Sequence, residues 1–594
     1  MFKLQNIPKL MRKSFILFLS FTLIVTLFSC KTDRNNEDNT IHIRLKKDPE
    51  RINPLLFPNP TSREIYQYIH LPLADLDPDD LELSPILIDK IPVEMAIDTG
   101  KYKGGVYFDI TILPEAKWDN GSPITAEDYL FTLKAINLPI SNAGKTREIT
   151  QNISEVIPDP SDPKKFRVIF AKDYILALEA AVNIEIYPRY VYDSLNVLSS
   201  YNFVDLNEAN EAKIKADSGL VQFADRFNSN TFSRDIISGS GPYKFVSWVS
   251  DQNIVLEKKS NYWGASNKHK SLSQGPDKMV FHIIADELAA VSQLRSGTID
   301  VINEISADSY KELSEDSAIK ENFSFFHPAL IKQYFININN QDPILSDRNV
   351  RRALAHLVDV DNIISNLESG MGVRSVGPVH PIKKTFNKDL VPLPFDPSKA
   401  KELLSQSGWK DGDADGILEK VINGKKTNLD IEILISGQEL GKKLALMLQE
   451  SAQNAGINLR ITEKDFKLIR AENLKTRKFQ LVLAVISQDI IAWDDLNKWH
   501  SKNDTPDGSN EMSYRNKVTD DMIDNIIVTK DINERIGLYK KIQEQIYNDQ
   551  PAIFLYAPEE KIVISKKWNS SATAKRPGYV ANTFTLSGVK IVHQ

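Results

Sequence analysis

Apolar and polar residues follow two different periods along this chain. Strict alternation in 41–45, 106–113 and 165–171 predicts β-strands with one buried face. The nearly continuous apolar run at 479–487 predicts a strand that is buried on both faces. Helical spacing of apolar residues predicts amphipathic helices at 123–136, 286–297, 349–367, 396–408, 444–456 and 534–549. Strands and helices that alternate in this way predict an α/β protein with mixed sheets.

Several residues predict where these elements begin and end. Thr125 is a suitable N-cap for the first helix, and Asp128 lies in the first turn, where the helix dipole favours an acid. Gly297 is placed to close the second helix. The segment 244–259 reads as a hairpin that turns at Ser250-Asp251.

The N-terminal segment has the layout of an export signal. Residues 1–13 carry basic side chains and no acid, and Ser14–Phe28 carry no charge. This apolar run is shorter than the roughly 20 residues that a spanning helix needs. It ends in Leu27-Phe28-Ser29-Cys30, which resembles the bacterial lipobox. The resemblance implies a signal peptide at 1–29, lipid on Cys30, and a location in the cell envelope, in the periplasmic space, anchored to a membrane.

Two further features bear on this N-terminal prediction. Cys30 is the only cysteine of the chain, so a disulfide within one chain is excluded. Residues 30–40 are polar and charged, which predicts a flexible tether. The alternative is an N-terminal membrane helix with an incidental cysteine. A start at Met11 would leave a proper basic segment as well.

Length and charge narrow the class of protein. A chain of 594 residues exceeds what one hydrophobic core supports, so two or more lobes are expected. Charged residues make up 26% and the net charge is −6, without a basic block that would indicate nucleic acid as a partner. No second apolar run of the sequence approaches the length of a membrane span.

Sequence signatures of common enzymes are absent. The chain contains no HExxH, GxSxG, Walker A or GxGxxG pattern, and its nine histidines are scattered. His282 and His356 are expected to be packed or capped rather than catalytic. We therefore expect neither catalysis nor a cofactor, although distant paired carboxylates of a hydrolase would escape this search.

One segment resembles the beginning of a calcium-binding loop. Asp411, Asp413 and Asp415 alternate, and Gly416 follows them, as in such loops. The twelfth position is Ile422, where a bidentate acid is expected. We favour an Asp/Gly-rich turn between a helix and the next strand, and these three aspartates stay weak metal candidates.

Several separate segments, in order, resemble family 5 of the bacterial extracellular solute-binding proteins, the dipeptide- and oligopeptide-binding type. The most specific is KWDNGSPITAEDYLFTL at 117–133, which matches the family signature almost letter for letter. The other matching segments are 238–264, 294–302, 334–364, 395–409, 513–524 and 534–556. Because they occur in the family's order, chance is a poor explanation.

This resemblance implies a fold and a mode of action. The fold is a two-lobed periplasmic-binding-protein fold, type II, of the large three-subdomain peptide-binding class, with a hinge. Lobe I would comprise 41–326, with an inserted extra subdomain, and the returning segment 563–594. Lobe II would be 327–562. Such a protein, a monomer, closes on its solute and docks on the permease of an ABC transporter that an ATPase drives.

The resemblance also implies a ligand site. In peptide-binding members, an aspartate after a strand meets the ammonium of the peptide, and Asp489 falls at that position. The preceding strand edge, here Val485 and Ser487, would pair with the peptide backbone. Trp493 and Asp494 replace the family's second Asp-Pro, which weakens the peptide assignment.

Other solutes and roles therefore stay open. Relatives in this family bind nickel chelates, opines and sugars, so an oligosaccharide, an opine or a metal chelate is an alternative ligand. Trp493 or Trp499 would favour stacking on a sugar or on an apolar side chain. A surface or signalling binder without a transporter is a further alternative.

Overall fold

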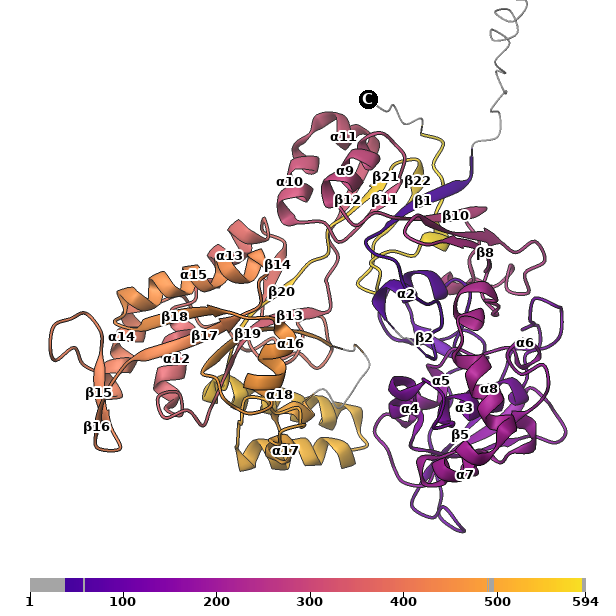
Figure 1. Ribbon diagram of the computed structural model, residues 1–594, viewed down its shortest axis with the longest axis horizontal. Coiled ribbons are helices and arrows are strands. Elements are labelled where there is room, and N and C mark those ends of the chain that lie inside the picture. Colours follow the sequence, from indigo (N-terminus) through magenta and orange to yellow (C-terminus); the bar gives the residue numbers. More distant parts are fainter. Residues whose placement is uncertain (1–37, 57–58, 489, 491–495, 590–594) are drawn as a thin grey trace, which may run out of the picture. The chain divides into compact units, whose positions relative to one another are not determined.

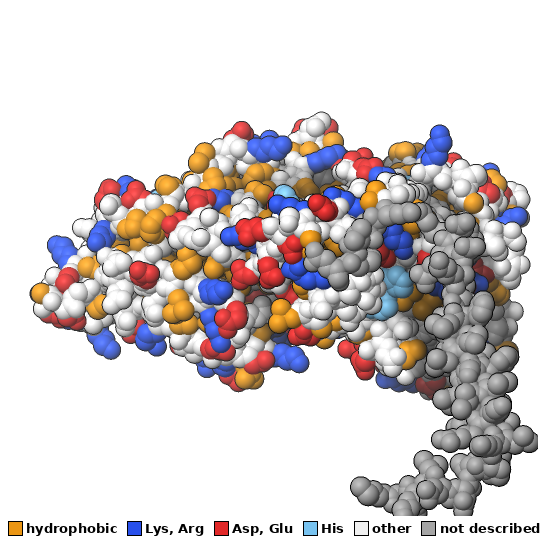
Figure 2. Space-filling view, turned by 90° about the horizontal axis from the view of Figure 1, so that it is seen from above, with side chains coloured by type: hydrophobic (Ala, Val, Ile, Leu, Met, Phe, Trp, Pro, Cys, Tyr) orange, Lys and Arg blue, Asp and Glu red, His pale blue; other side chains and the backbone are white. Residues whose placement is uncertain are grey.

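The computed structural model describes residues 38–56, 59–488, 490 and 496–589. Two large mixed sheets and a smaller four-stranded sheet organise this part of the chain (Figure 1). None of the helices in this part is long and apolar enough to cross a membrane. Cys30 and the predicted signal peptide lie outside the described residues. Basic and acidic side chains are mixed over the face presented in Figure 2.

The seven-stranded sheet joins the first and the last parts of the described chain. β1 (Thr40–Leu45) pairs in parallel with β11 (Val301–Ile302) and lies between β11 and β10 (Lys278–Ile283), so this strand is central and its apolar residues are fully buried. The strand order is β12 (Phe323–Phe326), β21 (Ile562–Ser565), β11 (Val301–Ile302), β1 (Thr40–Leu45), β10 (Lys278–Ile283), β9 (Asn253–Lys258) and β8 (Tyr243–Val249).

The four-stranded sheet has a hydrophobic core of its own. Trp118 and α3 (Ala126–Asn137) are part of this core. The predicted start of α3 is confirmed, with Thr125 as N-cap and its backbone N–H donating to Asp128 Oδ2 at 2.9 Å. The strand order is β4 (Met95–Ala96), β5 (Val106–Thr111), β7 (Lys165–Phe170) and β6 (Ile153–Pro158).

The six-stranded sheet is buried on both faces because alternate residues of its strands enter different cores. Ile336 and Ile553 pack against α12 (Arg348–His356), α14 (Pro397–Gln406) and α15 (Glu439–Asn454). Phe335 and Phe554 pack on the side of α17 (Lys517–Val528) and α18 (Ile532–Asp549). The strand order is β14 (Gly372–Arg374), β20 (Ala552–Pro558), β13 (Lys332–Ile338), β19 (Leu481–Ser487), β17 (Asp430–Ile435) and β18 (Asn458–Glu463).

The chain passes between the two large sheets twice. Residues 327–331 lead from β12 to β13, and residues 559–561 lead from β20 to β21. The two segments contact each other, since His327 Nδ1 lies 2.7 Å from Glu559 Oε2 and Glu560 N–H donates to Pro328 O at 2.8 Å.

Other elements complete the described chain. They include α2 (Pro60–Tyr66), β2 (Ala74–Leu76), β3 (Leu83–Pro85), α4 (Gly144–Thr150), α5 (Ala177–Val182), α6 (Arg189–Tyr192), α7 (Glu211–Ala216), α8 (Ser218–Asn228), α9 (Glu287–Arg295), α10 (Ala307–Glu315), α11 (Ser317–Asn322), α16 (Phe466–Leu468), β22 (Trp568–Asn569) and β23 (Thr585–Leu586). Gly297 follows α9 with φ 71°, as a closing glycine does.

The structure differs from the sequence prediction at three places. The strand at 479–487, predicted to be buried on both faces, is partly exposed in its later half, where Val485 is 52% exposed. The single helix expected at 349–367 is two helices, α12 and α13 (Val360–Leu367), because Asp359 caps the second by accepting from Asn362 N–H at 3.1 Å. The Asp/Gly-rich turn leads into an unpredicted hairpin, β15 (Glu419–Ile422) with β16 (Lys425–Asn428), whose mostly polar residues lack an apolar alternation.

Candidate functional site

β19 has one paired edge and one half-open edge. It pairs with β13 along its whole length, from Leu481 opposite Ile338 to Ser487 opposite Lys332. On its other side it pairs with β17 only at Leu481 and Val482, because β17 ends at Ile435 while β19 continues. Within the described residues, the later half of this edge has no neighbouring strand.

The backbone of Val485 and Ser487 points to the open side. Gln480 O accepts from Asn339 N–H at 3.0 Å, and Gln488 N–H donates to Ile331 O at 3.2 Å, so the even-numbered residues of β19 bond toward β13. In an antiparallel pair, the residues between them bond away from that partner. Val485 and Ser487 therefore present N–H and C=O groups to which an extended chain can add as a strand.

Gln488 fixes the end of this strand. Its side-chain Nε2 donates to Pro378 O at 2.8 Å and also contacts Gln333 Oε1, while its Oε1 accepts from His380 N–H at 3.1 Å. These contacts hold the backbone next to position 489. Asp489, Trp493 and Asp494 themselves lie outside the described residues, so their predicted roles stay predictions.

His380 is a neutral, buried partner in this arrangement. Its ring nitrogens contact the backbone on both sides, with Nε2 3.1 Å from Leu330 O and Nδ1 accepting from Ile382 N–H at 3.2 Å. Burial lowers the pKa of His380 to about 4. The imidazole is therefore uncharged at neutral pH, and its protonation would place a second donor against Ile382 N–H.

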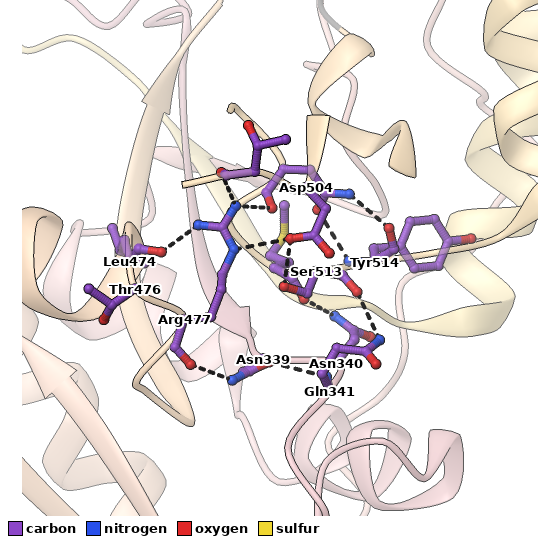
Figure 3. Close-up of polar contacts among 12 residues, drawn as sticks. Asn339, Asn340, Gln341, Leu474, Thr476, Arg477, Asp504, Ser513 and Tyr514 are labelled. Atoms are coloured by element: carbon purple, nitrogen blue, oxygen red, sulfur yellow. Dashed lines mark hydrogen bonds and ion pairs between the residues drawn. The ribbon is translucent and has the colours of Figure 1, made fainter. Parts of the chain in front are cut away.

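A polar network anchors the opposite end of β19 to the loop before α17 (Figure 3). Arg477 donates from Nε to Asp504 Oδ1 at 3.2 Å and from Nη2 to Asn510 O at 2.9 Å. Asn339 Nδ2 bonds to both Arg477 O and Phe479 O at 3.0 Å. The network therefore holds the loop before α17 against the start of β19.

Asp504 is the charged centre of that network. Its side chain is 6% exposed and accepts from Arg515 at 2.7 Å and from Ser513 Oγ at 2.9 Å in addition to Arg477. Burial alone would raise the pKa of Asp504, but these hydrogen bonds outweigh it and hold the pKa below its usual range. The acid is therefore a structural anion.

Three other side chains singled out in the sequence prove to be structural. Trp499 is fully buried and packs near Tyr514 and Phe554, so it is not available to stack on a sugar. His356 is buried, with Nδ1 2.9 Å from Pro394 O, and His282 Nε2 lies 2.9 Å from His42 Nδ1.

The Asp/Gly-rich segment at 411–419 has a lysine beside its acidic side chains. Ligand atoms of Asp411, Asp413 and Glu419 lie within 4.8 Å of one another. Lys426 Nζ lies 2.7 Å from Asp413 Oδ2 and 3.5 Å from Glu419 Oε1. Asp415 lies outside this group and accepts from Ile417 N–H at 2.8 Å, which supports the turn. An ammonium that already lies beside these acids reduces their affinity for a metal ion.

Sequence reasoning missed the contacts that hold the end of β19. Gln333, His380 and Gln488 come from three separate segments, and no spacing or pattern relates them. Only the pairing of β13 with β19 brings two of them together.

Comparisons with known proteins identify the architecture. A family model described as "Bacterial extracellular solute-binding proteins, family 5 Middle" matches residues 102–507. The oligopeptide-binding protein AppA of Bacillus subtilis is 24% identical over 477 residues, which cover 80% of this chain and 79% of that protein. The dipeptide-binding protein DppE of the same species is 23% identical over 534 residues, which cover 88% and 87%.

Solved structures share the fold. AppA of Bacillus subtilis in complex with a nonapeptide aligns with a TM-score of 0.64 at 21% identity over 92% of this chain and 99% of that one. NikA of Brucella suis in complex with Fe(III)-EDTA aligns with a TM-score of 0.71 at 18% identity over 92% and 99%. These likenesses confirm the expected type II periplasmic-binding-protein fold with mixed sheets.

Proposed function

Because the chain belongs to the bacterial extracellular solute-binding proteins, family 5, we propose that it captures oligopeptides and delivers them to the permease of an ABC importer. The relatives AppA and DppE are oligopeptide- and dipeptide-binding proteins, which supports a peptide as the ligand. In this role the protein binds and releases its ligand without covalent chemistry.

One observation carries the peptide assignment, namely the open half of the β19 edge. Val485 and Ser487 face it with backbone groups that have no partner among the described residues, in keeping with the hydrogen-bond parity of the strand. Backbone pairing of this kind depends little on side chains, so it suits a receptor for varied peptides.

Asp489 would complete the peptide site. It follows Gln488 directly, and the backbone of Gln488 is held by β13 and by the contacts of its side chain. A carboxylate placed at the end of the added strand would form a charge-assisted hydrogen bond with a free ammonium. Trp493 and Asp494 would then border the ligand.

We also propose that the protein has two lobes joined by a hinge and a lipid anchor at its N-terminus. Lobe I would be 41–326 with 563–594, and lobe II would be 327–562, with the two crossing segments as the hinge. The two chain crossings lie side by side, in contact at His327–Glu559 and at Pro328–Glu560, which supports a hinge at that place. Lipid on Cys30 would keep the binder near its permease.

Calorimetry with a defined peptide pool tests the function. We expect the protein to bind peptides with a free N-terminus and to lose at least tenfold in affinity on Asp489→Ala, because one charge-assisted contact is removed. The control is Asp389→Ala, which removes an exposed aspartate elsewhere in the same part of the chain. An unchanged affinity in Asp489→Ala would remove Asp489 from the site.

The same titration separates the alternative ligands. Binding of an oligosaccharide, an opine or a metal chelate, together with no binding of any peptide, would keep the fold and replace the ligand. Genes for a permease and an ATPase beside this one would support import, whereas their absence would favour a surface or signalling binder.

A further inference from the structure

Beside the open edge, one face of the six-stranded sheet holds a short row of side chains. Tyr334 lies directly opposite Val485, and Lys332 lies directly opposite Ser487. Directly paired residues project to the same face of a sheet, and Ile336 of the same strand marks it as the face that packs against α12, α14 and α15. A strand added at the edge would continue both rows on this face.

Lys332 gives one row a positive charge. It is half-buried, and among the described residues no carboxylate forms a salt bridge with it, although Glu304 is near enough for Lys332 to help lower the pKa of that acid. Acids near the crossing segments already have other partners: Glu559 pairs with His327, Glu304 with Arg576, and Glu368 with Lys561. Among the described residues of β19, Ser487 is the one directly opposite Lys332, and its side chain is small. An acidic ligand side chain in this row would meet an unpaired cation.

The neighbouring row is apolar and aromatic. Val485 is 52% exposed, although it is a large aliphatic residue at the end of a buried strand. Behind it, the Tyr334 ring stacks on Tyr556 with centroids 5.1 Å apart, which holds that ring in place. A ligand side chain beside Val485 would cover its exposed surface, and cross-strand pairs of this kind favour apolar partners.

We propose that the open edge of β19 selects peptides with an apolar residue opposite Val485 and an acidic residue two positions away, opposite Ser487 and Lys332. The spacing of two follows from the pleat, because only every second residue of an added strand projects to this face. The inference rests on the proposed function, since it requires that the ligand be a peptide that adds to β19. Val485 sets the apolar preference and Lys332 sets the acidic preference.

The experiment is selection from a random peptide pool by the purified protein, with mass spectrometry of the bound fraction. We expect enrichment of an apolar residue and, two positions away, of Glu or Asp. A peptide from the enriched set should bind about tenfold more tightly than the same peptide with Gln in place of the acid, as expected for a charge-assisted contact.

Three variants assign the preference to Lys332. Lys332→Met should abolish the enrichment of acids and equalise the Glu and Gln peptides, while it keeps the apolar preference. Lys332→Arg should retain both preferences. Lys425→Met, in the exposed β15–β16 hairpin, removes the same charge from the chain and should change neither preference. Thermal melting of each variant shows that the fold is intact.

The outcomes separate the specificity from the function. Peptide binding without enrichment of acids, or acid enrichment that persists in Lys332→Met, overturns the role of Lys332 while the peptide function stands. If the wild-type protein retains no peptide at all, the proposed function fails and the specificity fails with it.

Discussion

The two ends of β19 differ in what lies beside them. Leu481 and Val482 are fully buried between β13 and β17, whereas Val485 is 52% exposed and Ser487 is exposed. Both ends pair with β13 in one unbroken register, so the difference arises on the other side, where β17 ends. The early end of a neighbouring strand thus leaves half of a core strand with backbone groups that no other described strand pairs.

The ends also differ in how they are fixed. The enclosed end is fixed by apolar packing and by the ion-paired network around Asp504. The open end is fixed by uncharged hydrogen bonds of Gln488 with the backbone of Pro378 and His380. Mutation and acid should therefore affect the two ends differently. Changes at the enclosed end should lower the free energy of unfolding most, whereas the open end should be the more sensitive to acid.

The largest effect on stability is expected at the enclosed end. Leu481→Ala removes a fully buried side chain from the core with α12, α14 and α15 and should lower the free energy of unfolding by about 2–5 kcal/mol. Val485→Ala, its control in the same strand, should cost less than about 1 kcal/mol because that side chain is half exposed. Chemical denaturation measures both, and equal losses would contradict the difference in burial.

Breaking the polar network around Asp504 should lower the free energy of unfolding by about 3 kcal/mol. Arg477→Met leaves the carboxylate of Asp504 buried with Arg515 as its remaining cation, and an incompletely paired buried charge is strongly destabilising. Lys475→Met is the control, since its pair with Asp507 is exposed. A loss for Arg477→Met no greater than for this control would show that the network does not fix the loop.

As the pH falls below neutral, the open end of β19 should weaken before the enclosed end does. The pKa of His380 is about 4 when folded, below its ordinary value of 6.5, so its contribution is complete above pH 6.5 and lost as the pH falls toward 4. The shift corresponds to at most about 3 kcal/mol. Asp504 has a lowered pKa, so its contribution is lost only below the ordinary range of a carboxyl group.

Stability measured from pH 7 to pH 4 tests this order. The wild-type protein should lose stability across this range, and His380→Gln should lose less because it removes one titrating ring, while His70 and His282, whose pKa values burial also lowers, still titrate. Peptide affinity should fall in the same range, since His380 N–H holds Gln488 beside the site. An identical profile for wild type and His380→Gln would show that His380 does not contribute to the loss.

The sequence predicts β19 as a strand but not the difference between its ends. The apolar run at 479–487 looks alike along its length, and the open half depends on where β17 ends about fifty positions earlier in the chain. The roles of Val485, Ser487 and Asp489 came from resemblance to the family rather than from any local pattern. Asp359 shows a similar limit, because apolar spacing continues across it and conceals the break between α12 and α13.

The smallest change in stability should accompany a clear change in binding. Val485→Pro removes an N–H that faces the open side, and proline is tolerated where a strand edge has no partner. Stability should change by only about 1 kcal/mol, while peptide affinity should fall roughly tenfold through loss of one backbone hydrogen bond. Ile486→Pro, one residue on, removes an N–H that bonds to β13 and should instead destabilise the fold by about 3 kcal/mol or more. Peptide affinity that survives Val485→Pro intact would mean that the ligand does not add to β19 as a strand, since strand addition at this position uses the N–H that proline removes.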